Sequence, residues 1–96
     1  MSYELKSSSL FLEQLKTISP HGKMLIESKL DLIKQNPFRF KRIHSRKFSQ
    51  VFRIRLNLDG KDCRLIFVIL NGAVILVCIL ERKNDYRELE GMLRKI

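Results

Sequence analysis

The chain has 96 residues, 45% of them hydrophobic and 30% charged, with a formal net charge of +9 and a pI near 10.0. This length allows one domain with a modest core, and the composition excludes a disordered chain. Nucleic acid, an anionic membrane surface or an acidic protein are the partners that such a charge attracts. The start, MSYELKSSSLF, lacks the features of a secretory signal, and two cysteines fit a reducing compartment, so we expect a cytoplasmic protein.

The first third of the chain predicts a short strand over residues 3–6 and then two helices. Serines at 7–9 supply N-caps for a helix over residues 10–18. A second helix starts with Ser19 as N-cap and Pro20 at its first position. We expect it to end before Pro37, because the residue before a proline avoids the helical region. The short connection predicts an antiparallel helical pair.

The middle of the chain is strongly basic. Residues 39–64 contain nine Lys or Arg against two Asp, and so supply +7 of the total charge. Within this segment the alternating pattern of residues 51–58 predicts a strand, and Asp59-Gly60 predicts a hairpin turn after it.

The apolar stretch over residues 65–80 predicts a second hairpin, not a membrane helix. A membrane helix needs about 20 consecutive apolar residues, whereas Asn71-Gly72 divides this stretch into runs of six and eight. Asn-Gly favours a type I′ turn, and Val, Ile and Phe are typical of strands. A last helix starts near Asp85. The predicted order is β-α-α-β-β-β-α, one α+β domain over residues 1–96 with an antiparallel sheet and helices on one side.

Hairpin register predicts a cluster of arginines. With Asp59-Gly60 as the turn, Arg55 lies opposite Arg64, and Arg53 shares their face. Like charges placed opposite each other destabilise a sheet, while guanidinium groups suit phosphate oxygens. We therefore interpret the three as a polyanion-binding patch. A solvated basic face is the alternative.

The same counting for the second hairpin sets Arg64 opposite Ile79 and brings Arg82 beside the patch, with Tyr86 soon after. A phenol ring next to arginines suits a single-stranded nucleic acid, because a base can stack on the ring while the cations bind the backbone. Alternatively, Tyr86 only packs against the start of the last helix.

The remaining candidates have simpler explanations. His44 could be a general base or a surface residue, and Glu81 could accept a proton or form an ion pair; His21 is expected to be uninvolved. The same register puts Cys63 and Cys78 on one face, displaced by two residues, as core thiols. The sequence has no Gly-rich phosphate loop, paired carboxylates or metal-ligand spacing, so we expect no metal and no cofactor.

The chain resembles the RelE/ParE superfamily of bacterial and archaeal toxins from toxin–antitoxin pairs, in its order of elements and in the segments FRIRL, CRLIFVI and VILVCILERKNDY. In the RelE branch this resemblance implies a metal-independent, ribosome-dependent endoribonuclease of a type II pair, which inhibits translation by cutting mRNA. The RNA 2′-OH attacks the adjacent phosphate and leaves a 2′,3′-cyclic phosphate and a 5′-OH.

The resemblance also implies roles for individual residues. Arg53, Arg55 and Arg64 would hold and neutralise the scissile phosphate. Arg82 would stabilise the leaving 5′-oxygen, and Tyr86 would orient or stack on a base.

This chain departs from the best-known RelE enzymes in one respect, because their second-strand positions are lysines. Arginine is a poor general base, which leaves Glu81 or His44 as possible proton acceptors. Arg42, Arg46 and Lys47 are expected to add to RNA binding.

The resemblance implies an antitoxin whose acidic tail folds as it binds this basic domain. Further expected partners are mRNA and the ribosome, with DNA reached only through the antitoxin, and no membrane. Two alternatives remain: a ParE-like inhibitor of DNA gyrase, and a non-catalytic RNA- or ribosome-binding module.

Overall fold

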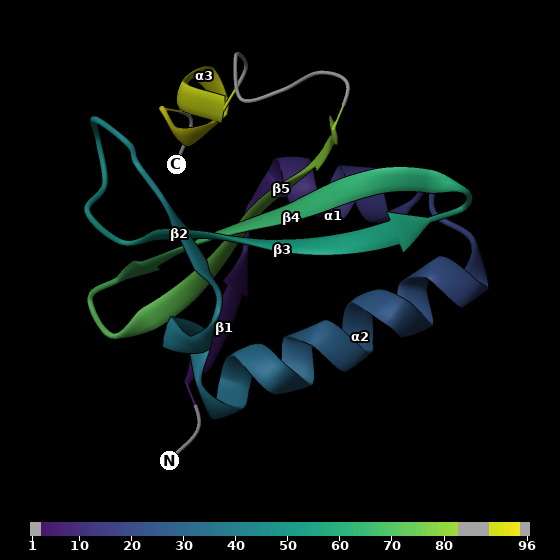
Figure 1. Ribbon diagram of the computed structural model, residues 1–96, viewed down its shortest axis with the longest axis horizontal. Helices are drawn as coiled ribbons and strands as arrows, with labels where there is room; N and C mark the ends of the chain where they lie inside the picture. The colour runs from purple at the N-terminus through teal and green to yellow at the C-terminus, as the bar shows by residue number, and fades with distance from the viewer. Residues whose placement is uncertain (1–2, 83–88, 95–96) are drawn as a thin grey trace.

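The computed structural model describes residues 3–82 and 89–94. Its elements are, in chain order, β1 Glu4–Ser7, α1 Ser9–Leu15, α2 Pro20–Gln35, the 3-10 helix η1 Pro37–Arg39, β2 Lys41–Ile43, β3 Val51–Leu58, β4 Lys61–Leu70, β5 Ala73–Glu81 and α3 Leu89–Leu93. One sheet, in the strand order β1-β5-β4-β3-β2, forms the centre of the molecule (Figure 1). The predicted α+β fold is confirmed. In the described ranges, no helix is long and apolar enough to cross a membrane.

Local signals in the sequence set the starts of the first two helices. Ser8 caps α1 by accepting a hydrogen bond from the Phe11 amide, and Ser19 caps α2 in the same way from the Gly22 amide. Pro20 occupies the first helical position of α2, as predicted. Helix α1 ends three residues earlier than expected, because after its last turn the amides at 16–18 bond to carbonyls three residues back and the chain turns.

Both predicted hairpin turns are confirmed. Asp59 and Gly60 have φ of 53° and 83°, and Asn71 and Gly72 have φ of 52° and 79°. Positive φ at both central residues defines the type I′ turn, whose twist matches that of the flanking strands. The first turn fixes the register of β3 and β4, with Arg55 directly opposite Arg64.

The sheet and the helices differ from the prediction in four respects. Strand β1 pairs with β5 in the parallel direction, so the sheet is mixed, and β2 adds a short edge strand that pairs with β3. Helices α1 and α2 pack on β5 and β3, with more contact to these strands than to each other. Helix α3 packs on the opposite face, so helices cover both sides of the sheet (Figure 1).

A β-bulge interrupts the pairing of β4 with β5. Phe67 lies opposite Leu76, whereas its neighbour Ile66 lies opposite Cys78, so Val77 is an extra residue in β5. A bulge shifts the register by one and reverses which residues face each side of the sheet beyond it.

The bulge corrects two predictions that assumed unbroken pairing. Arg64 lies opposite Leu80, not Ile79. Cys63 and Cys78 do not share a face: Cys63 belongs to the core on the α1 and α2 side, and Cys78 to the core on the α3 side.

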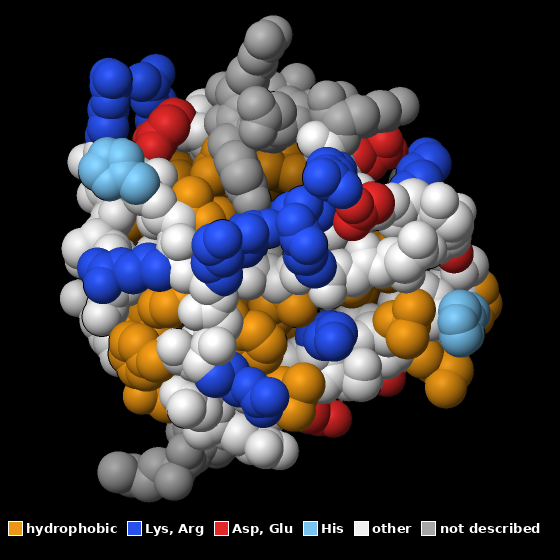
Figure 2. Space-filling view, in the orientation of Figure 1, with side chains coloured by type: hydrophobic (Ala, Val, Ile, Leu, Met, Phe, Trp, Pro, Cys, Tyr) orange, Lys and Arg blue, Asp and Glu red, His pale blue; other side chains and the backbone are white. Residues whose placement is uncertain are grey.

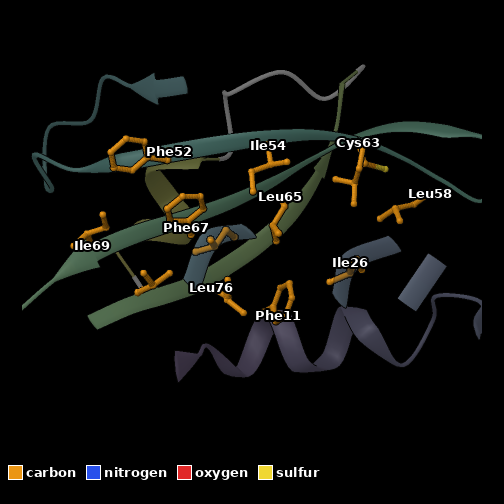
Figure 3. Close-up of a cluster of buried hydrophobic side chains, with 13 residues drawn as sticks. Phe11, Ile26, Phe52, Ile54, Leu58, Cys63, Leu65, Phe67, Ile69 and Leu76 are labelled. Carbon is orange, nitrogen blue, oxygen red and sulfur yellow. The ribbon is translucent and has the colours of Figure 1, made fainter. Parts of the chain in front are cut away.

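The sheet is buried on both faces. Figure 3 shows side chains of the larger core, among them the rings of Phe52 and Phe67. These two rings are stacked, with their centroids 5.3 Å apart. Residues of α1 and α2 belong to the same core. The smaller core joins the other face to α3, and its buried members are Val51, Ile66, Val68, Val77, Cys78, Leu80, Leu89 and Leu93. Burial on both faces explains why β4 and β5 are apolar almost without interruption.

The buried cysteines should be chemically inert in the folded protein. Burial raises the pKa of Cys78 to about 12 and also raises that of Cys63. Since the thiolate is the reactive form, we expect neither thiol to be alkylated by iodoacetamide at about pH 8, and both to react after unfolding in guanidinium. Mass spectrometry measures the modification, and a rapidly alkylated Cys78 in native protein would contradict the buried placement.

Asp59 connects the first hairpin turn to the start of α2. Its carboxylate accepts hydrogen bonds from the Ser19 hydroxyl and from the Ser19 amide, the latter at 3.2 Å. The hydroxyl bond, followed by the amide bond, lowers the pKa of Asp59 below the ordinary 3.8.

This contact predicts an acid-sensitive contribution to stability. Because the pKa of Asp59 is lower in the folded state, its contribution is complete above about pH 4 and is lost as the pH falls through the folded value. Asp59→Asn should therefore weaken the dependence of Tm on pH between about pH 6 and pH 2.5, whereas Asp31→Asn, at an exposed position of α2, should not. Identical pH profiles for the wild type and Asp59→Asn would rule out this contribution.

Candidate nucleic-acid interface

Three arginines gather on the face of the sheet opposite α1 and α2. Arg53 and Arg55 of β3 and Arg64 of β4 form this arginine patch, in which Arg55 and Arg64 are direct cross-strand neighbours. Lys and Arg side chains spread across the middle of the surface in Figure 2. A cross-strand pair of like charges does not by itself stabilise a sheet.

Arg64 is the charged residue that lies buried in the described chain, with 6% of its surface exposed. Its Nη1 atom lies 3.2 Å from Oδ1 of Asp62, two residues earlier on the same strand. The other carboxylate oxygen, Oδ2, lies 3.4 Å from Nη1 of Arg82. Because a buried charge is costly unless it is paired, Asp62 makes the position of Arg64 tolerable.

The other two members of the patch are more open. Arg55 is exposed and Arg53 is half-buried. Within residues 3–82 and 89–94, neither has a carboxylate at ion-pair distance. Their charges are therefore not neutralised within this part of the chain.

The bulge in β5 decides which residue joins the patch at the end of the sheet. Because Cys63 lies opposite Glu81, Arg82 follows level with Asp62 and on the side of Leu80. Without the extra residue, alternation would have placed Glu81 there instead. The contact between Arg82 and Asp62 confirms the prediction that Arg82 lies beside the arginines. The pairing of β4 with β5 that brings it there differs from the pairing that was counted from the hairpin turn.

Glu81 lies on the other side of the sheet end. Its carboxylate is 3.4 Å from Nζ of Lys61, and both residues line a cavity of about 190 Å³ with Gln14 and Ile18. This is the side covered by α1 and α2, opposite to Arg53, Arg55 and Arg64. At the end of the sheet, Glu81 also lines a wider pocket with Asp62 and Arg82.

His44 lies beyond the end of the sheet that is farther from Arg55 and Arg64. It is exposed and follows Ile43, which pairs with Val51 at the start of β3. Val51 is four residues from Arg55, or about 13 Å along the strand. The structure therefore does not place His44 beside the pair of Arg55 and Arg64.

Arg42 was predicted to bind RNA, and it has a structural contact in the folded chain. Its guanidinium donates to the Ser49 carbonyl, with Nε at 2.9 Å. This contact closes the loop between β2 and β3.

The same loop is attached to α3. Nζ of Lys47 lies 3.4 Å from the Leu93 carbonyl at the end of α3, and the Arg46 amide donates to Oε1 of Glu90 at 3.1 Å. A lysine near the last carbonyls of a helix complements their partial negative charge. Lys47 therefore stabilises the position of α3, while the exposed Arg46 side chain stays a predicted RNA contact.

Tyr86, which was predicted to stack on a base, lies outside the described residues. Among those that are described, no group of three or more His, Cys, Asp or Glu side chains is placed to hold a metal ion.

Asp62 is the residue of this site that the sequence prediction missed. A signal was present, because residues two apart on a strand share a face, which puts Asp62 beside Arg64. In the sequence it was counted only as one of two acids in a basic segment.

Among solved structures, a free-state variant of the E. coli toxin RelE, in which two arginines are replaced by alanine, matches with a TM-score of 0.73. The match covers 100% of both chains at 17% sequence identity. No family model matches the sequence, and no curated protein sequence matches it. The chain therefore has the RelE toxin fold, as the resemblance predicted.

Proposed function

We propose that this chain is the toxin of a type II toxin–antitoxin pair and inhibits translation by cutting mRNA on the ribosome. The observation that carries the proposal is the pair of Arg55 and Arg64 on a RelE fold, with Arg64 buried beside Asp62. Folding gains nothing from placing these two cations together, whereas a scissile phosphate requires such a site.

The proposed reaction is an internal transesterification. The 2′-oxygen of the RNA forms a bond to the adjacent phosphorus, the bond from phosphorus to the 5′-oxygen breaks, and the products are a 2′,3′-cyclic phosphate and a 5′-OH. The 2′-OH loses a proton and the leaving oxygen gains one.

Negative charge increases on the phosphate oxygens in the transition state of this reaction. Arg53, Arg55 and Arg64 hold these oxygens and stabilise the charge, and Arg82 stabilises the leaving 5′-oxygen. Tyr86 stacks on a base and fixes the RNA. Since arginine is a poor base, catalysis depends mainly on position and charge, with no metal or cofactor.

The proposed partners follow from the same site. The antitoxin presents an acidic segment that folds over the basic domain and covers the arginine patch, and DNA is reached only through the antitoxin. The chain acts in the cytoplasm, where mRNA and ribosomes are available.

The proposal is tested by inducing expression of the intact chain, Arg55→Ala and Lys23→Ala in bacteria. Both substitutions remove an exposed cation, but Lys23 lies on α2, away from the patch. We expect growth arrest and new mRNA ends, detected by primer extension, for the intact chain and Lys23→Ala, and neither for Arg55→Ala. Arrest without cleavage would indicate gyrase inhibition or passive ribosome blockade. No arrest from folded protein would indicate a binding module.

A further inference from the structure

The carboxylate of Asp62 bridges two arginines that come from different strands. Oδ1 is 3.2 Å from Nη1 of Arg64 in β4, and Oδ2 is 3.4 Å from Nη1 of Arg82 at the end of β5. Two oxygens of one anionic group thus each meet a separate guanidinium. This is also how two oxygens of a phosphodiester are held by a pair of arginines.

The fold fixes this arrangement. The type I′ turn sets Asp62 and Arg64 on the patch side of β4, and the bulge at Val77 brings Arg82 level with them. The Asp62 end of this arrangement is open to solvent, because Asp62 and Arg82 line a pocket of about 540 Å³ together with Lys61 and Glu81 at the end of the sheet.

The exposed fractions of the three side chains show that Asp62 is the group that another anion can replace. The Arg64 side chain is 7% exposed and needs a counter-charge, whereas Asp62 and Arg82 are 48% and 67% exposed. Ion pairs between exposed groups contribute little, so Asp62 can turn to solvent at small cost once another anion neutralises Arg64.

We propose that Asp62 occupies the phosphate-binding position between Arg64 and Arg82 in the free protein, and that a phosphate of the RNA displaces it. The inference rests on the proposed function in that it assigns this position to the scissile phosphate. It makes Asp62 an internal competitor that lowers the affinity of the free protein for RNA.

The test compares Asp62→Asn with the wild type and with Asp31→Asn, which removes the same charge from an exposed position of α2. The probe is a 2′-O-methyl RNA oligonucleotide, which cannot be cleaved because its 2′-oxygens are blocked. Asp62→Asn should bind it about tenfold more tightly than the wild type, because it removes a like charge from the phosphate position. Asp31→Asn should bind as the wild type does.

A second measurement separates competition from a structural role. Without its counter-charge, Asp62→Asn should unfold at a lower temperature than the wild type, and inorganic phosphate should raise its Tm more than that of the wild type. Asp62→Glu, which keeps the charge, should stay close to the wild type in both measurements.

Binding of Asp62→Asn that is unchanged or weaker would overturn the inference, as would equal Tm shifts with phosphate in Asp62→Asn and wild type. Because the probe is not cleaved, the result is independent of catalysis. If Asp62→Asn bound RNA more tightly but the wild type never cut RNA, the two proposals would be separated. The phosphate-binding position of Asp62 would be supported, and the proposed ribonuclease activity would be contradicted.

Discussion

Replacing Arg64 by methionine is expected to slow RNA cleavage by about 10²- to 10³-fold, the usual loss when one donor to a transition-state oxyanion is removed. Arg64 is buried with its guanidinium at the patch, and methionine fills similar space without a charge. The half-exposed Asp62 keeps its contact with Arg82, so the variant should fold. Single-turnover cleavage measures the rate, and circular dichroism measures the Tm.

The matched control is Lys23→Met, which makes the same kind of change on the exposed surface of α2. It should cleave RNA at the wild-type rate. If Arg64→Met were folded and equally fast, Arg64 would be a structural residue and the patch would not be the site of cleavage.

The second large effect concerns stability. Phe67→Ala should lower the free energy of unfolding by about 3–5 kcal/mol, the usual cost of removing a buried phenylalanine. The Phe67 side chain is fully buried, stacks on Phe52 with ring centroids 5.3 Å apart, and meets the edge of Phe40 at 6.1 Å. Small domains are stable by only about 5–15 kcal/mol, so the variant should be close to unfolding. Urea unfolding followed by circular dichroism measures the difference.

Phe38→Ala is the control for this prediction. The Phe38 ring also contacts Phe52, at 5.9 Å, but 48% of the residue is exposed. Its loss should cost about 1 kcal/mol, because little apolar surface returns to water. Equal costs for the two variants would mean that the stacked pair does not organise the core.

The parts of the fold that were predictable depend on neighbouring residues. Ser19 caps the start of α2 and Pro20 fits its first position, so the start of this helix can be predicted from these two residues alone. In the same way, Asn71-Gly72 and Asp59-Gly60 predict the two turns, because these residues adopt positive φ readily. A turn of known length fixes the pairing beside it, which is why Arg55 opposite Arg64 could be derived from the sequence.

Features that depend on distant parts of the chain could not be predicted in this way. Nothing in residues 4–7 indicates that β1 pairs with β5 in the parallel direction, and the five-residue α3 is placed by packing against the far side of the sheet. The bulge at Val77 falls within a continuous apolar run, where no polar residue marks a change of face.

The bulge matters most for the candidate site. It moves Arg82 to the side of Arg64 and Asp62, and turns Glu81 toward Lys61 on the other side. Which residues belong to the site therefore depends on one inserted residue in β5. Counting residue pairs outward from the turn assumes unbroken pairing, so it cannot reveal this insertion.

The central claim is that the arginine patch supports cleavage of RNA through its own 2′-oxygen. The most direct measurement is to add the purified chain to ribosomes carrying a defined mRNA and to determine the chemistry of the new ends. We expect fragments with a 2′,3′-cyclic phosphate and a 5′-OH, which are absent when the nucleotide at the cut carries a 2′-deoxy sugar. Intact mRNA in the presence of folded protein, or cleavage that persists at the 2′-deoxy nucleotide, would contradict the claim.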